Sequence, residues 1–173
     1  MIIGVDRFQF AFYGDDTETS PGVVDNDLHF WVGTYDYEVQ SRKIYKDGTL
    51  LVNDTTGQSF QGSGNAAIGI TSWNMVDDYY GAIYSVGIFD YALNQDEILS
   101  IMNGNQDSIQ NMSGLIALWD LSENVDFESN IVEDSSGNTY NGIINGATWQ
   151  TDSDPCCYDA ENDADGDGAC GDV

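Results

Sequence analysis

The segment RKIYKDGTLLV, residues 42 to 52, constrains the fold of this chain more than any other stretch of the sequence. Two apolar runs flank Asp47 and Gly48, and an Asp-Gly pair readily adopts the positive φ angles that a two-residue hairpin turn requires. The segment therefore predicts a β-hairpin, and it favours a fold built from antiparallel strands.

Other segments of the body also have the spacing or composition of strands. Phe8, Phe10 and Phe12 alternate with Gln9 and Ala11, which is the period of a half-buried strand. Further strands are predicted at Leu28 to Tyr35, Ala66 to Thr71, Gly81 to Asp90, Gly114 to Leu121 and Thr139 to Trp149. Turn-forming residues separate these strands, and no regular alternation with helices is present. The sequence thus predicts an all-β fold, a two-sheet antiparallel sandwich.

One short helix interrupts the strands. Asn94 is a suitable N-cap residue, and Glu97 follows three residues later to complete a capping box. Ile98, Ile101 and Met102 then fall at i, i+3 and i+4, which gives the helix one apolar stripe.

The charge balance excludes two classes of partner. Thirty acidic residues stand against four basic ones, for a formal net charge of -26. The basic residues are Arg7, Arg42, Lys43 and Lys46, and they are too few to form the basic face that a nucleic-acid binder needs. An anionic membrane would repel this surface, and no apolar run approaches the roughly 20 residues of a membrane-spanning helix.

The composition changes at about Thr151. From there to Val173 the chain has eight acidic residues and no basic one, so it cannot bury enough apolar surface to fold unaided. It needs a metal ion, a disulfide, or both. All three cysteines lie there (Cys156, Cys157 and Cys170), and an odd number leaves at least one unpaired within the chain.

The order of several motifs carries a family resemblance. DNDLHFWVGTYDYEVQSRKIYKDGTLL, residues 25 to 51, and YYGAIYSVGIFDYALNQDEI, residues 79 to 98, resemble the LamG-like branch of the concanavalin A-like lectin/glucanase superfamily. The matching residues are His29, Gly33, Thr34, Tyr35, Asp36, Arg42, Ile44, Tyr45, Asp47, Gly48, Ile68, Gly69, Ala92 and Leu93. The resemblance implies a β jelly roll. The chain departs from the family where Tyr84 and Ser85 stand in place of an acidic pair.

A second segment, residues 114 to 149, resembles the opening strands of the same family. The acidic tail follows at once and leaves no room for a second complete domain. We therefore interpret this segment as completing the first sandwich in permuted order; a truncated second copy is the alternative. The predicted domains are a jelly roll over 1–150 and a separate tail over 151–173. We also expect the chain to be a fragment, because it starts without a signal peptide.

The tail resembles the start of a thrombospondin type 3-like calcium repeat. Asp163, Asp165, Asp167 and Gly168 form D-x-D-x-D-G, whose acidic positions and following carbonyl, here on Ala169, supply the oxygen ligands that calcium prefers. Asp172 falls one residue later than the family pattern, so the site is incomplete or continues beyond the chain. A disulfide from Cys156 or Cys157 to Cys170 would close the same loop and suits an oxidising compartment; the resemblance favours Cys156.

Catalysis is not expected. The glucanases of the superfamily place three carboxylates on one strand face, and none of the strands predicted here carries that spacing. The nearest cluster is Glu123, Asp126 and Glu128, where alternation would put the first two on opposite faces and where the sequence reads as a loop. The sequence therefore predicts a protein that is not an enzyme.

Carbohydrate binding is the leading prediction for function. The loop TSWNMVDDYYG, residues 71 to 81, combines aromatic rings with amide and carboxylate groups, and such loops on rigid sandwiches often carry binding residues. The candidate ligand-binding residues are Trp73, Asn74, Asp77, Asp78 and Tyr80. An ordinary loop with its aromatics folded onto the core is the alternative.

Two kinds of residue are assigned to structure rather than function. His29 is the single histidine, with no Ser-His-Asp or metal-ligand grouping around it in the sequence. The family resemblance implies a place on a strand next to Trp31, so we expect it to be packed or hydrogen-bonded. Trp31, Trp119 and Trp149 lie in predicted strands and are expected in the core.

Together these features predict a secreted, non-catalytic binding or adhesion module of a larger extracellular or cell-surface protein. Its cofactor would be calcium, and its partner a glycan or another cell-surface or matrix ligand. A purely structural spacer is the rival prediction, and a glycoside hydrolase relative is the third.

Overall fold

A computed structural model of the chain shows the predicted hairpin at its expected place. Strands β5 (Ser41–Lys46) and β6 (Thr49–Thr55) pair antiparallel across the Asp47-Gly48 turn. Asp47 has φ +50° and Gly48 has φ +72°, so both turn residues are left-handed, as this turn requires. A Cβ on Gly48 would also lie 2.5 Å from Leu99 Cδ2 of the helix, so the end of that side chain would have to shift; the positive φ is what favours glycine here.

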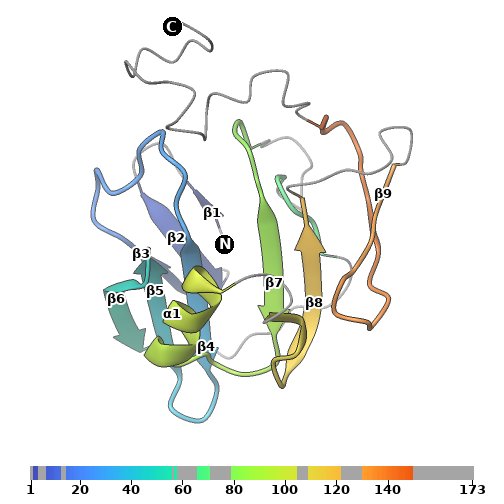
Figure 1. The fold of residues 1–173 in the computed structure, drawn as a ribbon. Helices are drawn as coiled ribbons and strands as arrows, with labels where there is room; N and C mark the ends of the chain where they lie inside the picture. Colours follow the sequence, from blue (N-terminus) through green and yellow to red (C-terminus); the bar gives the residue numbers. More distant parts are fainter. Residues whose placement is uncertain are drawn as a thin grey trace, which may run out of the picture.

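The structure describes residues 2–3, 7–12, 15–55, 57, 66–70, 79–104, 109–121 and 130–149 (Figure 1). The other strands are β1 (Ile2–Ile3), β2 (Phe8–Phe12), β3 (Asp15–Glu18), β4 (Trp31–Asp36), β7 (Ser85–Phe89), β8 (Leu115–Asp120), β9 (Ile131–Val132) and β10 (Gly142–Ile143). They form sheets in the orders β1-β2-β3, β4-β5-β6, β7-β8 and β10-β9, and every named pair is antiparallel. The predicted all-β class with one short helix is confirmed.

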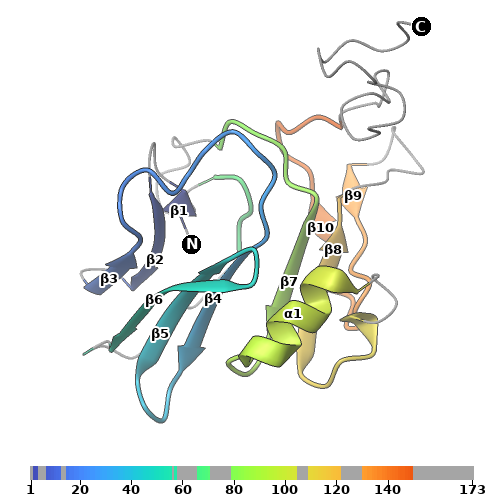
Figure 2. The same ribbon diagram turned by 60° about the vertical axis from the view of Figure 1, so that its left-hand side comes forward.

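The β1–β3 and β4–β6 sheets pack face to face through aromatic side chains. Phe8 stacks on Trp31 with ring centroids 4.3 Å apart, and Phe12 meets the ring of Tyr35 edge-on at 4.8 Å. Between the sheets lies the fully buried guanidinium of Arg42, 2.9 Å from a carboxylate oxygen of Asp15 and 5.0 Å from the centre of the Phe12 ring. This face of β4–β6 is therefore an interior surface (Figure 2).

Helix α1 (Gln95–Asn103) covers part of the opposite face of the same sheet. The predicted capping box is present, because Asn94 Oδ1 accepts from the backbone N–H of Glu97 and the Glu97 carboxylate accepts from that of Asn94. Ile98 is fully buried and clusters with Tyr45 of β5 and Leu93. Within the described residues no helix is long and apolar enough to cross a membrane.

Three of the strand predictions were too long, and a fourth, Ala66 to Thr71, was wrong over its described residues. Residues 28–30 precede β4 as an extended segment, residues 66–69 form no strand, and 81–84 precede β7. Of 139–149 only Gly142–Ile143 is a strand, so the prediction that Trp149 lies in a strand is wrong; its ring is half-buried. Trp119 in β8 is buried, as predicted, and Trp31 in β4 is half-buried. Composition marked these segments, but only backbone pairing, which is non-local, sets where a strand ends.

The segment that follows the helix extends the β structure. β8 pairs with β7 from Ser85↔Asp120 to Phe89↔Leu115, so two segments separated by the helix lie side by side. After β8 the chain turns back through Asp134, which bridges to Trp119. The assignment of 114–149 as a permuted completion, and the boundary at residue 150, stay predictions.

Candidate functional site

The predicted sugar loop lies mostly outside the described residues. Trp73, Asn74, Asp77 and Asp78 fall there, whereas Tyr80 is described. The Tyr80 side chain is 93% exposed, more than any other large hydrophobic residue of the described part. Just before it, the Tyr79 backbone N–H donates to the Gly69 carbonyl at 2.7 Å, so the end of the loop is anchored to the chain near residue 70.

The other predicted sites also lie outside the described residues. These are the calcium ligands Asp163, Asp165, Asp167, Ala169 and Asp172, the cysteines Cys156, Cys157 and Cys170, and the acidic cluster Glu123, Asp126 and Glu128. Their assignments stay predictions.

The structure reveals a polar surface that sequence reasoning missed. Strand alternation and register place Thr34, Asp36, Ser41, Lys43, Asn53 and Thr55 on the face of β4–β6 opposite the buried Arg42. We call these six residues the polar ladder. Directly opposite pairs are Asp36 with Ser41 and Thr34 with Lys43. Further along the same face are Val32 and Tyr45, which belong to the apolar cluster beside α1. One sheet face is thus divided into an apolar half packed with the helix and a polar half.

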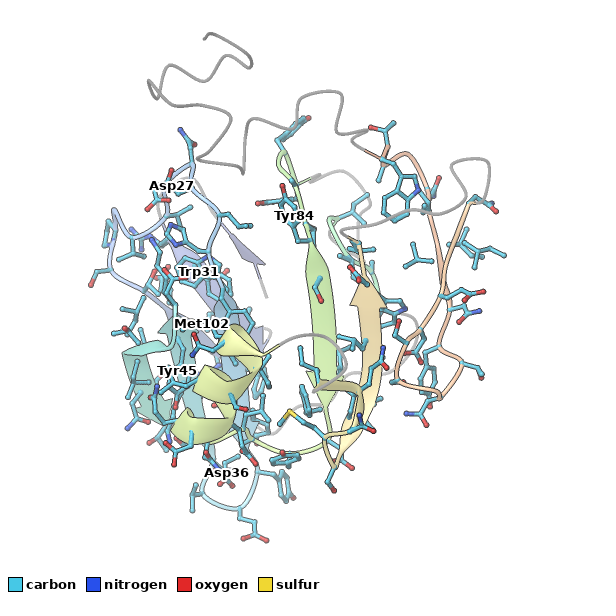
Figure 3. All side chains as sticks on the ribbon, viewed as in Figure 1. Asp27, Trp31, Asp36, Tyr45, Tyr84 and Met102 are labelled. Atoms are coloured by element: carbon cyan, nitrogen blue, oxygen red, sulfur yellow. The ribbon has the colours of Figure 1, made fainter. Side chains whose placement is uncertain are left out.

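A pocket of about 250 Å³ lies where these halves meet. Its lining comprises Thr34, Asp36, Val39, Ser41, Lys43, Ala92, Leu93 and Asn94. The floor therefore comes from two neighbouring strands, and one wall comes from the residues that lead into α1. Figure 3 labels Asp36 at one end of this sheet and Asp27 near the other.

Lys43 is unusual among the basic residues. Arg7 pairs with Glu18, Arg42 with Asp15 and Lys46 with Asp25, each at 2.9–3.0 Å. Within the part of the chain that the structure describes, the Lys43 side chain forms no hydrogen bond or ion pair.

The acceptor side of the pocket is held in place by the backbone. Asp36 Oδ1 accepts from the N–H groups of Glu38 and Val39, at 3.0 and 3.3 Å, and so fixes the turn between β4 and β5. Beside it, Ser41 Oγ lies 3.2 Å from Asn53 Oδ1 on the next strand. Counting back from Asp47-Gly48 could have placed residues 41, 43 and 45 on one face, but not Asn53, because a β-bulge between Ile44 and Tyr45 shifts the register of β6.

A second cluster surrounds His29 at the Asp47-Gly48 turn. His29 Nε2 lies 2.7 Å from Asp25 Oδ1, and Nδ1 lies 2.7 Å from Asp47 Oδ2. A neutral imidazole has one N–H donor, so two carboxylate partners require the doubly protonated, charged ring. Lys46 Nζ binds the other oxygen of Asp25 at 3.0 Å. We call Asp25, His29, Lys46 and Asp47 the His29 clasp.

Protonation in the clasp follows from these contacts. Burial opposes a charge on His29, but the hydrogen bonds to Asp25 and Asp47 prevail and raise the pKa of the imidazole above its ordinary value. The ammonium of Lys46 is the largest influence on Asp25, and it lowers the pKa of that carboxyl well below its usual range. The clasp thus ties residues 23–30 to the hairpin, together with a bond from the Phe30 N–H to Asp47 Oδ1 at 2.9 Å.

Two expectations for His29 need correction. It precedes β4 rather than lying within a strand, and a potential metal-ligand grouping does surround it. One ligand atom each of Asp25, Asp27 and His29 lies within 4.8 Å of the others. Because Lys46 and the charged imidazole already bind both oxygens of Asp25, an ion would have to displace them. The expectation that His29 is hydrogen-bonded is confirmed.

Comparison with known proteins identifies the family to which the chain belongs. Residues 3–99, more than half of the chain, match the sequence pattern of the concanavalin A-like lectin/glucanases superfamily. A comparison with curated proteins found no match. The structure is similar to the crystal structure of a candidate carbohydrate binding protein from Bacteroides ovatus, with a TM-score of 0.68 and 21% sequence identity. The alignment covers 84% of this chain and 42% of that one, so this chain spans less than half of the length of its structural relative. At this identity the likeness shows the fold alone. On the family match, the chain belongs to the concanavalin A-like lectin/glucanases superfamily.

Proposed function

We propose that the chain is a non-catalytic carbohydrate-binding module. The observation that carries the proposal is Tyr80, an aromatic side chain 93% exposed at the described end of the loop 71–81. The apolar face of a sugar ring suits a flat, accessible aromatic surface, and the contact removes apolar area of both from water. In the proposal, Tyr80 and Trp73 supply aromatic surface, and Asn74, Asp77 and Asp78 supply hydrogen bonds.

Two further facts support this proposal. The superfamily includes lectins, and the structural relative from Bacteroides ovatus is named as a candidate carbohydrate binding protein. The proposed place of action is outside the cell or on its surface, where millimolar calcium would fill the acidic repeat at 156–173. There the module would engage a glycan, or another cell-surface or matrix ligand.

A glycan array with the full chain in calcium tests the proposal. We expect selective binding that Tyr80→Ala or Trp73→Ala weakens at least about fivefold, because each substitution removes a contact surface of aromatic size. Tyr140→Ala is the matched control, since Tyr140 is also exposed, at 57%, but lies near β10. Equal effects of Tyr80→Ala and Tyr140→Ala would refute the loop assignment. If no glycan binds, the chain is better described as a structural spacer.

A further inference from the structure

We propose that the pocket between the polar ladder and the start of α1 binds one neutral sugar unit. This site is separate from the loop 71–81. The proposal rests on the proposed carbohydrate-binding function and names a place and a ligand class for it. The juxtaposition that carries it is Lys43 with Asp36 on adjacent strands of one pocket.

The pocket presents donors and acceptors in the mixture that hydroxyl groups need. A hydroxyl donates one hydrogen bond and accepts up to two. Lys43 has three N–H donors that no described residue occupies, and Asp36 keeps Oδ2, since its Oδ1 binds the turn. The hydroxyl of Thr34 serves as either donor or acceptor, whereas Ser41 Oγ, which donates its proton to Asn53 Oδ1, remains as an acceptor. Neighbouring hydroxyls on a sugar ring would therefore find partners of both kinds.

The size and rigidity of the pocket point to a small ligand. Its volume of about 250 Å³ is below the range of roughly 300–1,000 Å³ typical of sites for drug-sized molecules. The polar groups stand on paired strands, and Thr34 is only 6% exposed, so the pocket floor is preorganised. Such a floor suits one sugar unit held at fixed hydroxyl positions.

The charge of the chain favours a neutral ligand over an acidic one. Lys43 and Asp36 carry opposite charges within the pocket, and the pocket-lining Asn94 is followed by Asp96 and Glu97 in the first turn of α1. The net charge of -26 disfavours the approach of an anion. A neutral sugar would experience no such repulsion, and its binding should depend little on salt.

Backbone amide chemical shifts of the full chain test the pocket directly. Glucose, galactose and mannose are titrated in turn, with glucuronate as the anionic comparison. We expect at least one neutral sugar to shift the amides of residues 34, 36, 41, 43 and 94 in a saturable way, with little change between 50 and 500 mM salt. If no neutral sugar shifts these amides, the pocket proposal is wrong. A larger, salt-sensitive response to glucuronate would overturn the neutral ligand class.

Substitutions then separate this site from the loop. Lys43→Met should weaken the pocket response at least about tenfold, the loss expected for one hydrogen bond to a charged group, and Lys43→Arg should restore part of it. Asp36→Asn should also weaken it, while keeping an oxygen for the turn. Arg7→Met, which removes the same charge elsewhere, is the matched control.

The two proposals fail in different ways. If Trp73→Ala and Tyr80→Ala abolish glycan binding while Lys43→Met changes nothing, the pocket proposal is refuted and the proposed function stands. If the pocket responds to a monosaccharide and Trp73→Ala leaves that response unchanged, the pocket proposal is supported independently of the loop.

Discussion

The carboxylate of Asp134 is the strongest test of how the segment after the helix is held. The side chain is 9% exposed, and its two oxygens accept four hydrogen bonds of 2.9–3.0 Å. Three donors are the backbone N–H groups of Leu118, Ser136 and Tyr140, and the fourth is the Ser136 hydroxyl. One carboxylate thus joins β8 to the turn that follows it. Asp134→Ala removes all four bonds at once.

The cost can be worked from the donors left behind. Leu118 is 1% exposed, so its N–H would lose its acceptor in a buried place, at about 1–3 kcal/mol. The Ser136 and Tyr140 N–H groups belong to less buried residues that water can reach, and each adds less. We expect Asp134→Ala to lower the free energy of unfolding by about 3–5 kcal/mol, and Asp134→Asn, which keeps one acceptor oxygen, by about 1–3 kcal/mol.

Urea unfolding at pH 6 and pH 3 is the assay. Burial opposes the charge of Asp134, but the backbone hydrogen bonds prevail and lower the pKa of the carboxyl. A lowered pKa in the folded state stabilises the protein fully above the unfolded value of 3.8 and is lost as pH falls through the folded value. The difference between wild type and Asp134→Asn should therefore shrink at pH 3. Asp16→Ala, at an exposed β3 residue, is the control and should cost under about 0.5 kcal/mol. A cost below about 1 kcal/mol for Asp134→Ala, or a pH-independent difference, would refute the reasoning.

Three other predictions concern charged groups. Arg42→Met should lower the free energy of unfolding by about 3 kcal/mol in urea, because Asp15 and Asp54 would lose the buried guanidinium between the sheets; a cost under about 1 kcal/mol would contradict this. His29→Gln should destabilise the protein more at pH 5.5 than at pH 8.5. The raised pKa of His29 makes its contribution complete below about pH 6.5 and lost as pH rises through the folded value, so an equal cost at both pH values would argue against the clasp. Millimolar calcium should slow amide exchange over 156–173 in the oxidised chain, and Asp165→Ala should abolish the effect while magnesium substitutes poorly; unchanged exchange would count against the calcium assignment.

Local chemistry explains the parts of the fold that the sequence could predict. The Asp47-Gly48 turn needs two residues that tolerate positive φ, and the capping box at Asn94 and Glu97 lies within four residues, so both are visible without knowledge of distant partners. The burial of Arg42 could not be predicted from the sequence. An arginine is expected at the surface unless a partner compensates its charge. Here the partner is Asp15, 27 residues earlier, and the pair forms only when the two sheets pack together.

The site predicted from the sequence, the loop 71–81, is made of residues that are neighbours in the chain. The sites that the structure reveals are made of residues that are distant in the chain. The loop 71–81 drew attention because its aromatic and acidic residues are neighbours in sequence. In the His29 clasp and the pocket the groups come together only through pairing: Asp47 reaches His29 because β5 ends beside the start of β4, and Lys43 lies beside Thr34 because of the same register. That register was already determined by one Asp-Gly turn and the turn at 37–40. Alternation along β4 and β5 assigns their polar residues to faces, but the β-bulge between Ile44 and Tyr45 shifts the register of β6, so Asn53 and Thr55 could not be placed by counting from the Asp47-Gly48 turn. A row of polar residues on the sheet face against which an amphipathic helix packs would then indicate a candidate binding site. Here the row runs beyond the apolar residues that pack beside α1, and it leaves Lys43 facing a pocket rather than a carboxylate of the described chain.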